Sequence, residues 1–160
     1  MLGVRLICVG KMKEKFYIDA FNEYAKRLSA YCRFECVELA EIKQPENPSV
    51  KVTEAALKKE ASEIEKNIPR DAYLIAMCVE GGQLSSGDFA GILSDRALSG
   101  KPNVCFLIGS SFGLDESLKN KADMRLSMSR MTFPHHLARV MLAEQIYRGF
   151  KINEGSKYHK

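Results

Sequence analysis

The hydrophobic residues near the start of the chain follow two successive patterns. The run Val4 to Val9 is apolar apart from Arg5 and ends at Gly10. The next hydrophobic residues recur at helical spacing: Phe16, Ala20, Phe21, Tyr24 and Leu28. A short apolar run, a glycine and an amphipathic stripe predict a strand, a turn and a helix.

The same order of patterns is found again further along. Arg33 to Leu39 is typical of a strand, and the polar, proline-bearing segment Lys43 to Ser49 is typical of a loop. We expect Thr53 to be the N-cap of the next helix, because a threonine hydroxyl can accept a hydrogen bond from a free backbone N–H. The apolar positions of that helix are Leu57, Ala61, Ile64 and Ile68.

The middle of the chain contains the most apolar strand pattern. Ala72 to Val79 is apolar throughout, as expected of a central parallel strand covered on both faces, and Gly81-Gly82 is expected to end it. Ser85 and Asp88 have the spacing of a capping box, which predicts the start of a helix. The inward residues of that helix are expected to be Phe89, Ile92, Leu93 and Ala97.

The second half of the chain predicts two further strands and an unusually apolar helix. Val104 to Ile108 is a buried strand pattern, and Leu126 to Ser129 is expected to form a last short strand. From Pro134 to Ile152 the hydrophobic residues cover more than one helical stripe, so we expect this helix to be buried widely, in part by another subunit. Strands that alternate with helices predict an α/β layered fold with a mostly parallel sheet.

The composition predicts one domain in a reducing compartment. The chain has 160 residues, of which 46% are hydrophobic, so we expect a single domain over residues 1–160. There is no apolar stretch long enough to span a membrane and no visible signal peptide, which predicts a cytoplasmic protein without a membrane partner. The five cysteines are odd in number and lack the companion ligands of a metal site, so no metal is expected.

Basic residues are concentrated at the end of the chain, although the net charge is only +4. Residues 121–160 contain eight Lys and Arg against three Asp and Glu, whereas residues 1–120 contain 16 against 17. Such a segment suits a polyanionic partner, because neutralised phosphates release counterions. It suits an ordinary solvated surface equally well.

Three loops are candidates for a ligand site, because ligands of open α/β sheets bind beyond the carboxyl ends of the strands. The loops are Met77 to Gly82, Gly109 to Gly113, and Ser127 to Pro134. None has the glycine pattern of a dinucleotide-binding loop or a P-loop, so we set both kinds of site aside. The glycines of the second loop would let the backbone approach a ligand closely, but ordinary tight turns also contain two glycines.

Several motifs are shared with one known family. They are Val9-Gly10-Lys11, Lys13-Glu14, Pro45-Glu46-Asn47, Leu84-Ser85-Ser86, Ile108-Gly109, Met131-Thr132-Phe133-Pro134-His135, Arg139, Glu144-Gln145-Ile146-Tyr147-Arg148, Phe150-Lys151-Ile152 and Tyr158-His159-Lys160. On these residues the chain resembles, over its whole length, the 23S ribosomal RNA pseudouridine-N3-methyltransferases of the RlmH type, in the SPOUT superfamily. The resemblance implies a SPOUT-type parallel-sheet fold with a C-terminal deep trefoil knot, and a homodimer.

The resemblance also implies an activity and a cofactor site. The expected reaction is methyl transfer from S-adenosylmethionine to N3 of a pseudouridine in 23S rRNA, with the assembled ribosome as substrate. The implied cofactor-binding residues are Met77, Gly109, Met128, Ser129, Arg130, Met131, Thr132 and Phe133. Relatives often have glycine where this chain has Ser110, and leucine where it has Met77, so we expect differences of pocket detail and no change of cofactor.

The implied catalytic residues lie near the end of the chain. Tyr158 and His159 are candidates to orient or deprotonate the target base. Arg139, like Arg148, is a candidate to stabilise negative charge or hold phosphate. Without the resemblance, a terminal Tyr-His pair is usually frayed, and Arg139 would be assigned to an ion pair.

Two other functions stay open at this point. One is a SPOUT methyltransferase that acts on another RNA, and the other is a noncatalytic RNA-binding module. Binding of S-adenosylmethionine distinguishes an enzyme from such a module.

Overall fold

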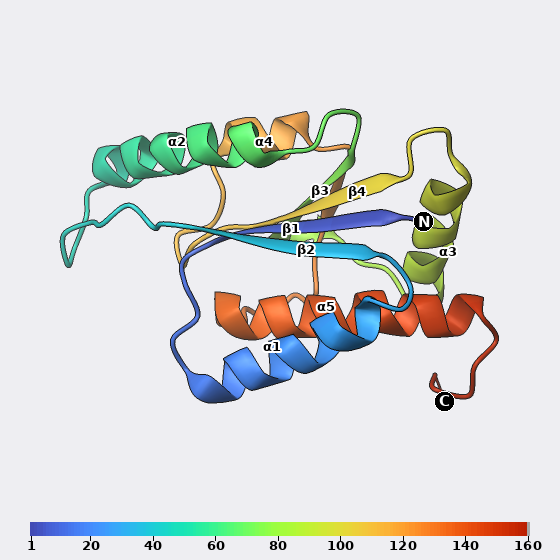
Figure 1. Ribbon diagram of the computed structural model, residues 1–160. Coiled ribbons are helices and arrows are strands. Elements are labelled where there is room, and N and C mark those ends of the chain that lie inside the picture. Colours follow the sequence, from blue (N-terminus) through green and yellow to red (C-terminus); the bar gives the residue numbers. More distant parts are fainter. Residues whose placement is uncertain (160) are drawn as a thin grey trace.

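The computed structural model describes residues 1–159, which form one parallel sheet with helices on both faces (Figure 1). The strands are β1 (Gly3–Val9), β2 (Arg33–Leu39), β3 (Tyr73–Gly82), β4 (Asn103–Ile108) and β5 (Met124–Leu126). They pair in parallel in the order β2-β1-β4-β3-β5. The helices are α1 (Lys15–Leu28), α2 (Val50–Asn67), α3 (Ser86–Leu98), α4 (Glu116–Lys121) and α5 (His135–Asn153). The predicted α/β class is confirmed.

Different helices cover the two faces of the sheet (Figure 1). On one face, Leu6 of β1 belongs to the same buried cluster as Phe89 of α3 and Leu142 of α5, and α1 joins them. On the other face, Ile7 of β1 clusters with Leu118 of α4 and with α2. Successive strand residues point to opposite faces, so a strand covered on both sides is apolar at every position. This explains the continuous apolar runs in the sequence.

Local hydrogen bonds set where α2 and α3 begin. The N-cap of α2 is Ser49 and not Thr53, because the Ser49 hydroxyl accepts a backbone hydrogen bond of 3.2 Å in the first turn. Thr53 lies inside the helix, where its hydroxyl donates to the Gln44 side chain at 2.8 Å. The capping box of α3 is confirmed, since the Ser85 hydroxyl accepts from the Asp88 N–H at 3.0 Å.

Strands β3 and β5 meet in an irregular pairing that the sequence did not predict. β3 continues through Gly81-Gly82, and β5 ends at Leu126 and not at Ser129. Leu126 pairs with both Met77 and Gly82, so the intervening residues of β3 bulge outward. A side-chain carbon at Gly81 would lie 2.8 Å from the backbone of residues 125 and 126. Only glycine therefore allows the two segments to approach this closely.

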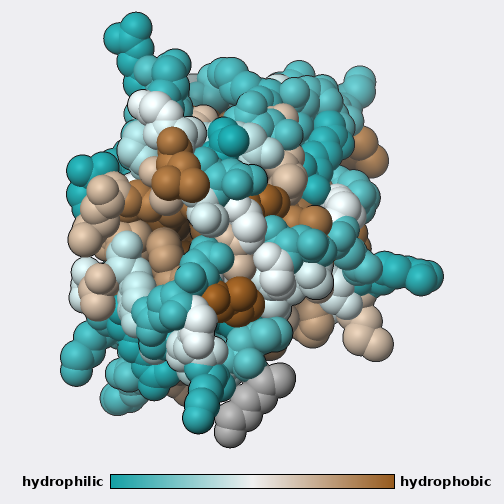
Figure 2. Space-filling model, turned by 90° about the vertical axis from the view of Figure 1, so that its right-hand side faces the viewer, coloured by the Kyte–Doolittle hydropathy of each residue, from teal (hydrophilic) through white to brown (hydrophobic). Residues whose placement is uncertain are grey.

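Two expectations about the helices were wrong, and one helix was missed. Phe16 was expected on a buried helical stripe but is 66% exposed, and Ala97 of α3 is exposed as well. Helix α4 was not predicted, because its six residues are mostly polar and too few to show an apolar stripe. The face of the molecule at the right of Figure 1 is largely hydrophilic, with hydrophobic residues visible in several places (Figure 2).

Helix α5 packs against both α1 and α3 on the same face of the sheet. No residue from 135 to 152 is fully exposed, so the expected wide burial is confirmed, and the chain itself provides much of the cover. The contact with α3 is close, because a side-chain carbon at Gly149 would lie 2.8 Å from Leu93. None of the helices within residues 1–159 combines the length and apolarity that a membrane crossing requires.

Candidate active site

A cavity of about 660 Å³ lies at the carboxyl ends of β3, β4 and β5. Its size is within the usual range of small-molecule sites, about 300–1,000 Å³. Met77 and the two segments Gly109 to Gly113 and Ser127 to Pro134 contribute to its wall. The structure therefore brings together the three loops that the sequence singled out, at the edge of the sheet where the topology predicts a ligand site.

Almost all of the residues that were expected to bind the cofactor line this cavity. The lining residues from that set are Met77, Gly109, Met128, Ser129, Met131, Thr132 and Phe133. Arg130 is the exception, because it is exposed and does not line the cavity. Phe112, His135 and Ala138 were not among the expected cofactor residues, but they also contribute. His135 directly follows the expected loop, and burial lowers its pKa below the usual histidine value.

The cavity wall is mainly apolar, with polar groups at a few places. Ile108, Leu114 and Met128 supply apolar surface. Ser110 and Ser127 are buried beside them, and the Ser127 hydroxyl donates to the carbonyl of Ser129 at 2.9 Å. Within residues 1–159, no three His, Cys, Asp or Glu side chains are grouped so that they could hold a metal ion. Apolar contacts and backbone groups suit a neutral ring and a short aliphatic chain.

The loop after β4 is closed on itself, and this explains its glycines. The Gly113 N–H donates to the Ser110 carbonyl at 2.9 Å, and Gly113 has a φ of +87°. A side-chain carbon at Gly109 would lie 2.2 Å from the Gly113 carbonyl oxygen. The space beside Gly109 is thus filled by the loop's own backbone. This corrects the expectation that Gly109 leaves room for a ligand, and makes it a requirement of loop closure.

A buried carboxylate connects this loop to α2. Glu60 is only 4% exposed and accepts a hydrogen bond from the Ile42 N–H at 2.9 Å. Burial raises its pKa above the usual value, although the hydrogen bond from Ile42 and the nearby Ser110 hydroxyl partly oppose this. The Ser110 side chain therefore lies near Glu60, which places the loop beside α2.

Arg139 is a buried anchor on the first turns of α5. It is 1% exposed, and its guanidinium donates to the Glu38 carboxylate at 2.6 Å and to the Gly10 carbonyl at 2.8 Å. Burial of the Glu38 carboxylate raises its pKa, but hydrogen bonds from Met12 and Arg139 outweigh this and leave the pKa below its usual value. The geometry favours the ion-pair interpretation of Arg139.

The tail folds back onto the middle of α5. The Tyr158 hydroxyl donates to Glu144 at 3.2 Å, and its ring packs edge-on against Tyr147 at 5.0 Å. Burial, followed by the nearby charge of Glu144, raises the pKa of Tyr158 to about 12. The exposed His159 lies 3.4 Å from Arg148, measured from Nδ1 to Nη1. Lys160 lies outside the described residues.

The three proposed catalytic residues do not form one cluster. Tyr158 and His159 lie together at the middle of α5, whereas Arg139 is directed toward β1 and β2. None of them lines the 660 Å³ cavity. Sequence reasoning missed Glu144 as a contact of the tail, although its i,i+4 spacing from Arg148 is the pattern of a helical ion pair.

The chain is similar over nearly its whole length to known proteins. A family model described as "Predicted SPOUT methyltransferase" matches residues 2–159. Proteins of Clostridium beijerinckii and Bifidobacterium adolescentis, both named ribosomal RNA large subunit methyltransferase H, are 46% and 47% identical to this chain. In each case the match extends over 159 residues, 99% of this chain and 100% of the relative.

A solved structure has a similar fold. A probable methylase family protein from Haemophilus influenzae matches with a TM-score of 0.54 at 15% identity, over 100% of this chain and 72% of that one. At this identity the likeness concerns the fold alone, and it agrees with the parallel sheet described above. The family model and the full-length relatives indicate a methyltransferase in addition to the fold. The chain belongs to the SPOUT methyltransferase family.

Proposed function

We propose that this protein transfers a methyl group from S-adenosylmethionine to N3 of a pseudouridine in 23S rRNA, within the assembled ribosome. The observation that carries the proposal is the cavity at the ends of β3, β4 and β5, which seven of the eight expected cofactor residues line. The name of the full-length relatives supports large-subunit rRNA as the substrate. A small protein gains RNA specificity from shape, which a large particle supplies.

The cavity fits the proposed cofactor. S-adenosylmethionine has an adenine ring, a ribose and a methionine chain, which need apolar contacts and backbone or hydroxyl partners. Met77, Ile108 and Leu114 would supply the apolar contacts, and the backbone of the Gly109 and Met128 loops would supply polar ones. When bound, the cofactor supplies an electrophilic methyl group on a sulfonium.

The chain must then align the target base and remove its N3 proton. A tyrosine whose pKa is about 12 stays protonated at neutral pH, and because the Tyr158 hydroxyl donates to Glu144, its oxygen is suited to accept a hydrogen bond from an N–H of the base and orient it. That leaves His159, which is exposed at the end of the tail, as the candidate to accept the proton. Arg148 beside it would favour negative charge on the base.

Two measurements test the proposed function. Titration calorimetry should detect S-adenosylmethionine binding, and a chain without such binding would be a noncatalytic RNA-binding module. Mass spectrometry of 23S rRNA from a strain that lacks the protein should show an unmethylated pseudouridine, restored by the wild-type gene. Intact methylation of 23S rRNA together with a lost methyl group elsewhere would instead indicate another RNA substrate.

We expect Gly109→Ala to weaken S-adenosylmethionine binding about 10-fold or more, because the loop must open to accept the side chain. Gly109→Val should act in the same direction. Gly91→Ala is the matched control, since a side chain there meets no atom within 4 Å. Calorimetry on both variants checks the expectation, and equal affinity of a folded Gly109→Ala protein would remove this loop from the site.

We further propose that residues 1–160 act as one domain with a deep trefoil knot and form a homodimer. The knot is supported by the pairing of Leu126 with both Met77 and Gly82, beside which the Ser127 N–H donates to the Gly82 carbonyl at 2.8 Å. The dimer is supported by a groove of about 520 Å³ beside α5, to which Val140 and Met141 contribute. The apolar part of this groove suits a self-complementary contact.

Sedimentation at micromolar concentration should therefore give the mass of a dimer. Met141→Glu should shift the protein toward monomer, because it adds a charge to the apolar groove on α5. Lys58→Glu on the exposed side of α2 is the control and should leave the mass unchanged. A wild-type monomer at this concentration would contradict the proposed assembly.

A further inference from the structure

Glu144 has the most polar contacts of any residue in the middle of α5. One carboxylate oxygen accepts from Arg148 at 2.6 Å and from the Tyr158 hydroxyl at 3.2 Å. The other oxygen accepts from the Gln145 amide at 2.8 Å. Only 17% of the Glu144 side chain is exposed, so it is screened less by water than an ordinary surface carboxylate.

The partners of Glu144 also contact one another. The Arg148 guanidinium lies over the Tyr158 ring, 4.8 Å from its centroid, and reaches His159 at 3.4 Å. The carboxylate, the guanidinium and the phenol thus form a closed set of contacts in which each touches the other two. A closed set restricts the tail more than any single contact, because breaking one contact leaves the other two.

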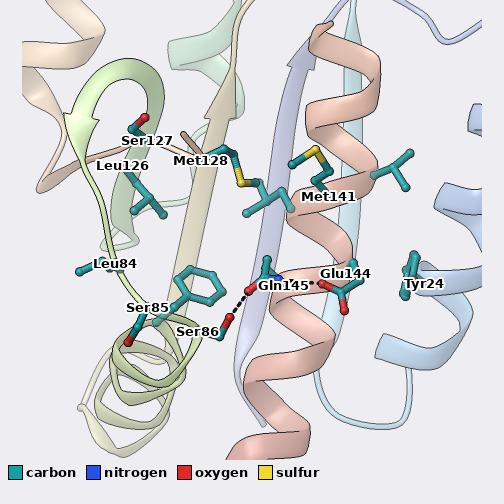
Figure 3. A pocket seen from close by; sticks show the side chains of 13 residues that line it. Tyr24, Leu84, Ser85, Ser86, Leu126, Ser127, Met128, Met141, Glu144 and Gln145 are labelled. Atoms are coloured by element: carbon teal, nitrogen blue, oxygen red, sulfur yellow. Dashed lines mark hydrogen bonds between the residues drawn. The ribbon is translucent and has the colours of Figure 1, made fainter. Parts of the chain in front are cut away.

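The same carboxylate is connected to the groove beside α5 (Figure 3). The Ser86 hydroxyl donates to the Gln145 side chain at 2.8 Å, and Gln145 in turn donates to Glu144. On the opposite wall of this groove stands Met128, which also lines the cofactor cavity. One oxygen of Glu144 is therefore linked through Gln145 to the groove beside α5, and the other oxygen holds the tail.

We infer that Glu144 is a positioning residue of the methyl-transfer reaction, which fixes Tyr158 and, through Arg148, His159. This inference rests on the proposed function, because it assumes that the tail acts on the target base. Glu144 itself does not touch the base or the cofactor. The tail of this chain is short and has no apolar stripe, and it is held by Glu144, by Arg148 and by the Tyr147 ring.

The inference predicts separate effects on tail order and on chemistry. Glu144→Ala should speed release of Tyr158 by a carboxypeptidase about 10-fold, because the docked tail opens more often. It should lower the single-turnover rate of ribosome methylation about 100-fold, the cost of a misplaced catalytic group, while S-adenosylmethionine affinity stays within about 3-fold. Glu144→Gln should lie between these values, since its amide oxygen still accepts a hydrogen bond from Tyr158.

Glu63→Ala provides the matched control, because Glu63 forms an exposed ion pair with Lys66 on α2 at 2.7 Å. It should change neither the carboxypeptidase release nor the methylation rate. A Glu144→Ala protein with an unchanged release rate would overturn the anchoring role, and a loosened tail with a normal methylation rate would overturn the link to chemistry. Carboxypeptidase release needs no activity, so an inactive wild-type protein would refute the proposed function without touching the anchoring result.

Discussion

Deletion of residues 158–160 is expected to abolish rRNA methylation and to change S-adenosylmethionine affinity little. The cofactor cavity is built from Met77 and the loops after β4 and β5, none of which contacts Tyr158 or His159. Because the two sites are separate, loss of the tail should impair methylation without impairing cofactor binding. Loss of Tyr158 removes the ring contact with Tyr147, the contact with Arg148 and the hydrogen bond to Glu144, so the free energy of unfolding should fall by about 1–3 kcal/mol.

Three measurements on the truncated protein check this result: single-turnover methylation of ribosomes, calorimetry with the cofactor, and thermal unfolding. His159→Ala removes the exposed imidazole and keeps the rest of the tail. It should lower the single-turnover rate more than it weakens ribosome binding. Lys157→Ala, which changes an exposed neighbour, serves as the control. Full activity of the truncated protein would exclude both Tyr158 and His159 from catalysis.

Arg139→Ala is expected to lower the free energy of unfolding by about 2–3 kcal/mol, because it breaks charge-assisted hydrogen bonds of a buried guanidinium whose partner Glu38 is 37% exposed. The substitution leaves the Gly10 carbonyl and part of the Glu38 carboxylate without their partner. Arg70→Ala, an exposed arginine after α2, is the control and should stay within about 0.5 kcal/mol of wild type. Urea unfolding at neutral pH gives both values.

A double variant distinguishes a structural role of Arg139 from a catalytic role. Arg139→Met with Glu38→Gln removes both charges and should recover part of the lost stability, because no unpaired charge remains. The folded pKa of Glu38 lies below its unfolded value, so its contribution is present above the usual carboxyl pKa and is lost as the pH falls. The acid sensitivity of unfolding should therefore decrease in this variant. A stable but inactive Arg139→Ala protein would restore Arg139 to the catalytic set.

Much of the sheet could be predicted from sequence because its signals are local. The runs at β1 and β4 are apolar at nearly every position, with Arg5 and Asn103 as the exceptions, which is the mark of a strand covered on both faces. Helix α4 and the end of β5 could not be predicted, since three to six residues carry too little periodicity. Thr53 was predicted to be the N-cap of α2, but another hydroxyl residue, Ser49, stands just before the helix and is the N-cap.

The site was predictable to the extent that its residues are close in sequence. The loop Met128 to Phe133 contributes five of its six residues to the cavity, and the family motif identified it as one unit. Partners of buried charges were not predictable. Arg139 contacts Glu38 across 101 positions and Gly10 across 129, and no pattern in a single sequence connects such positions. The resemblance grouped Arg139 with the tail, whereas side-chain geometry separates them.

The packing of α5 against α1 and β1 has a consequence for biosynthesis. Leu6 and Phe21 are synthesised early, but Leu142 and Ile146, which complete their cluster, belong to the last helix. Folding is slow when contacts join distant parts of a chain, because the loop between them must close first. At about 5–20 residues per second, the ribosome holds this chain for several seconds with one face of its sheet uncovered. Until α5 emerges, that face is open to chaperones and to aggregation.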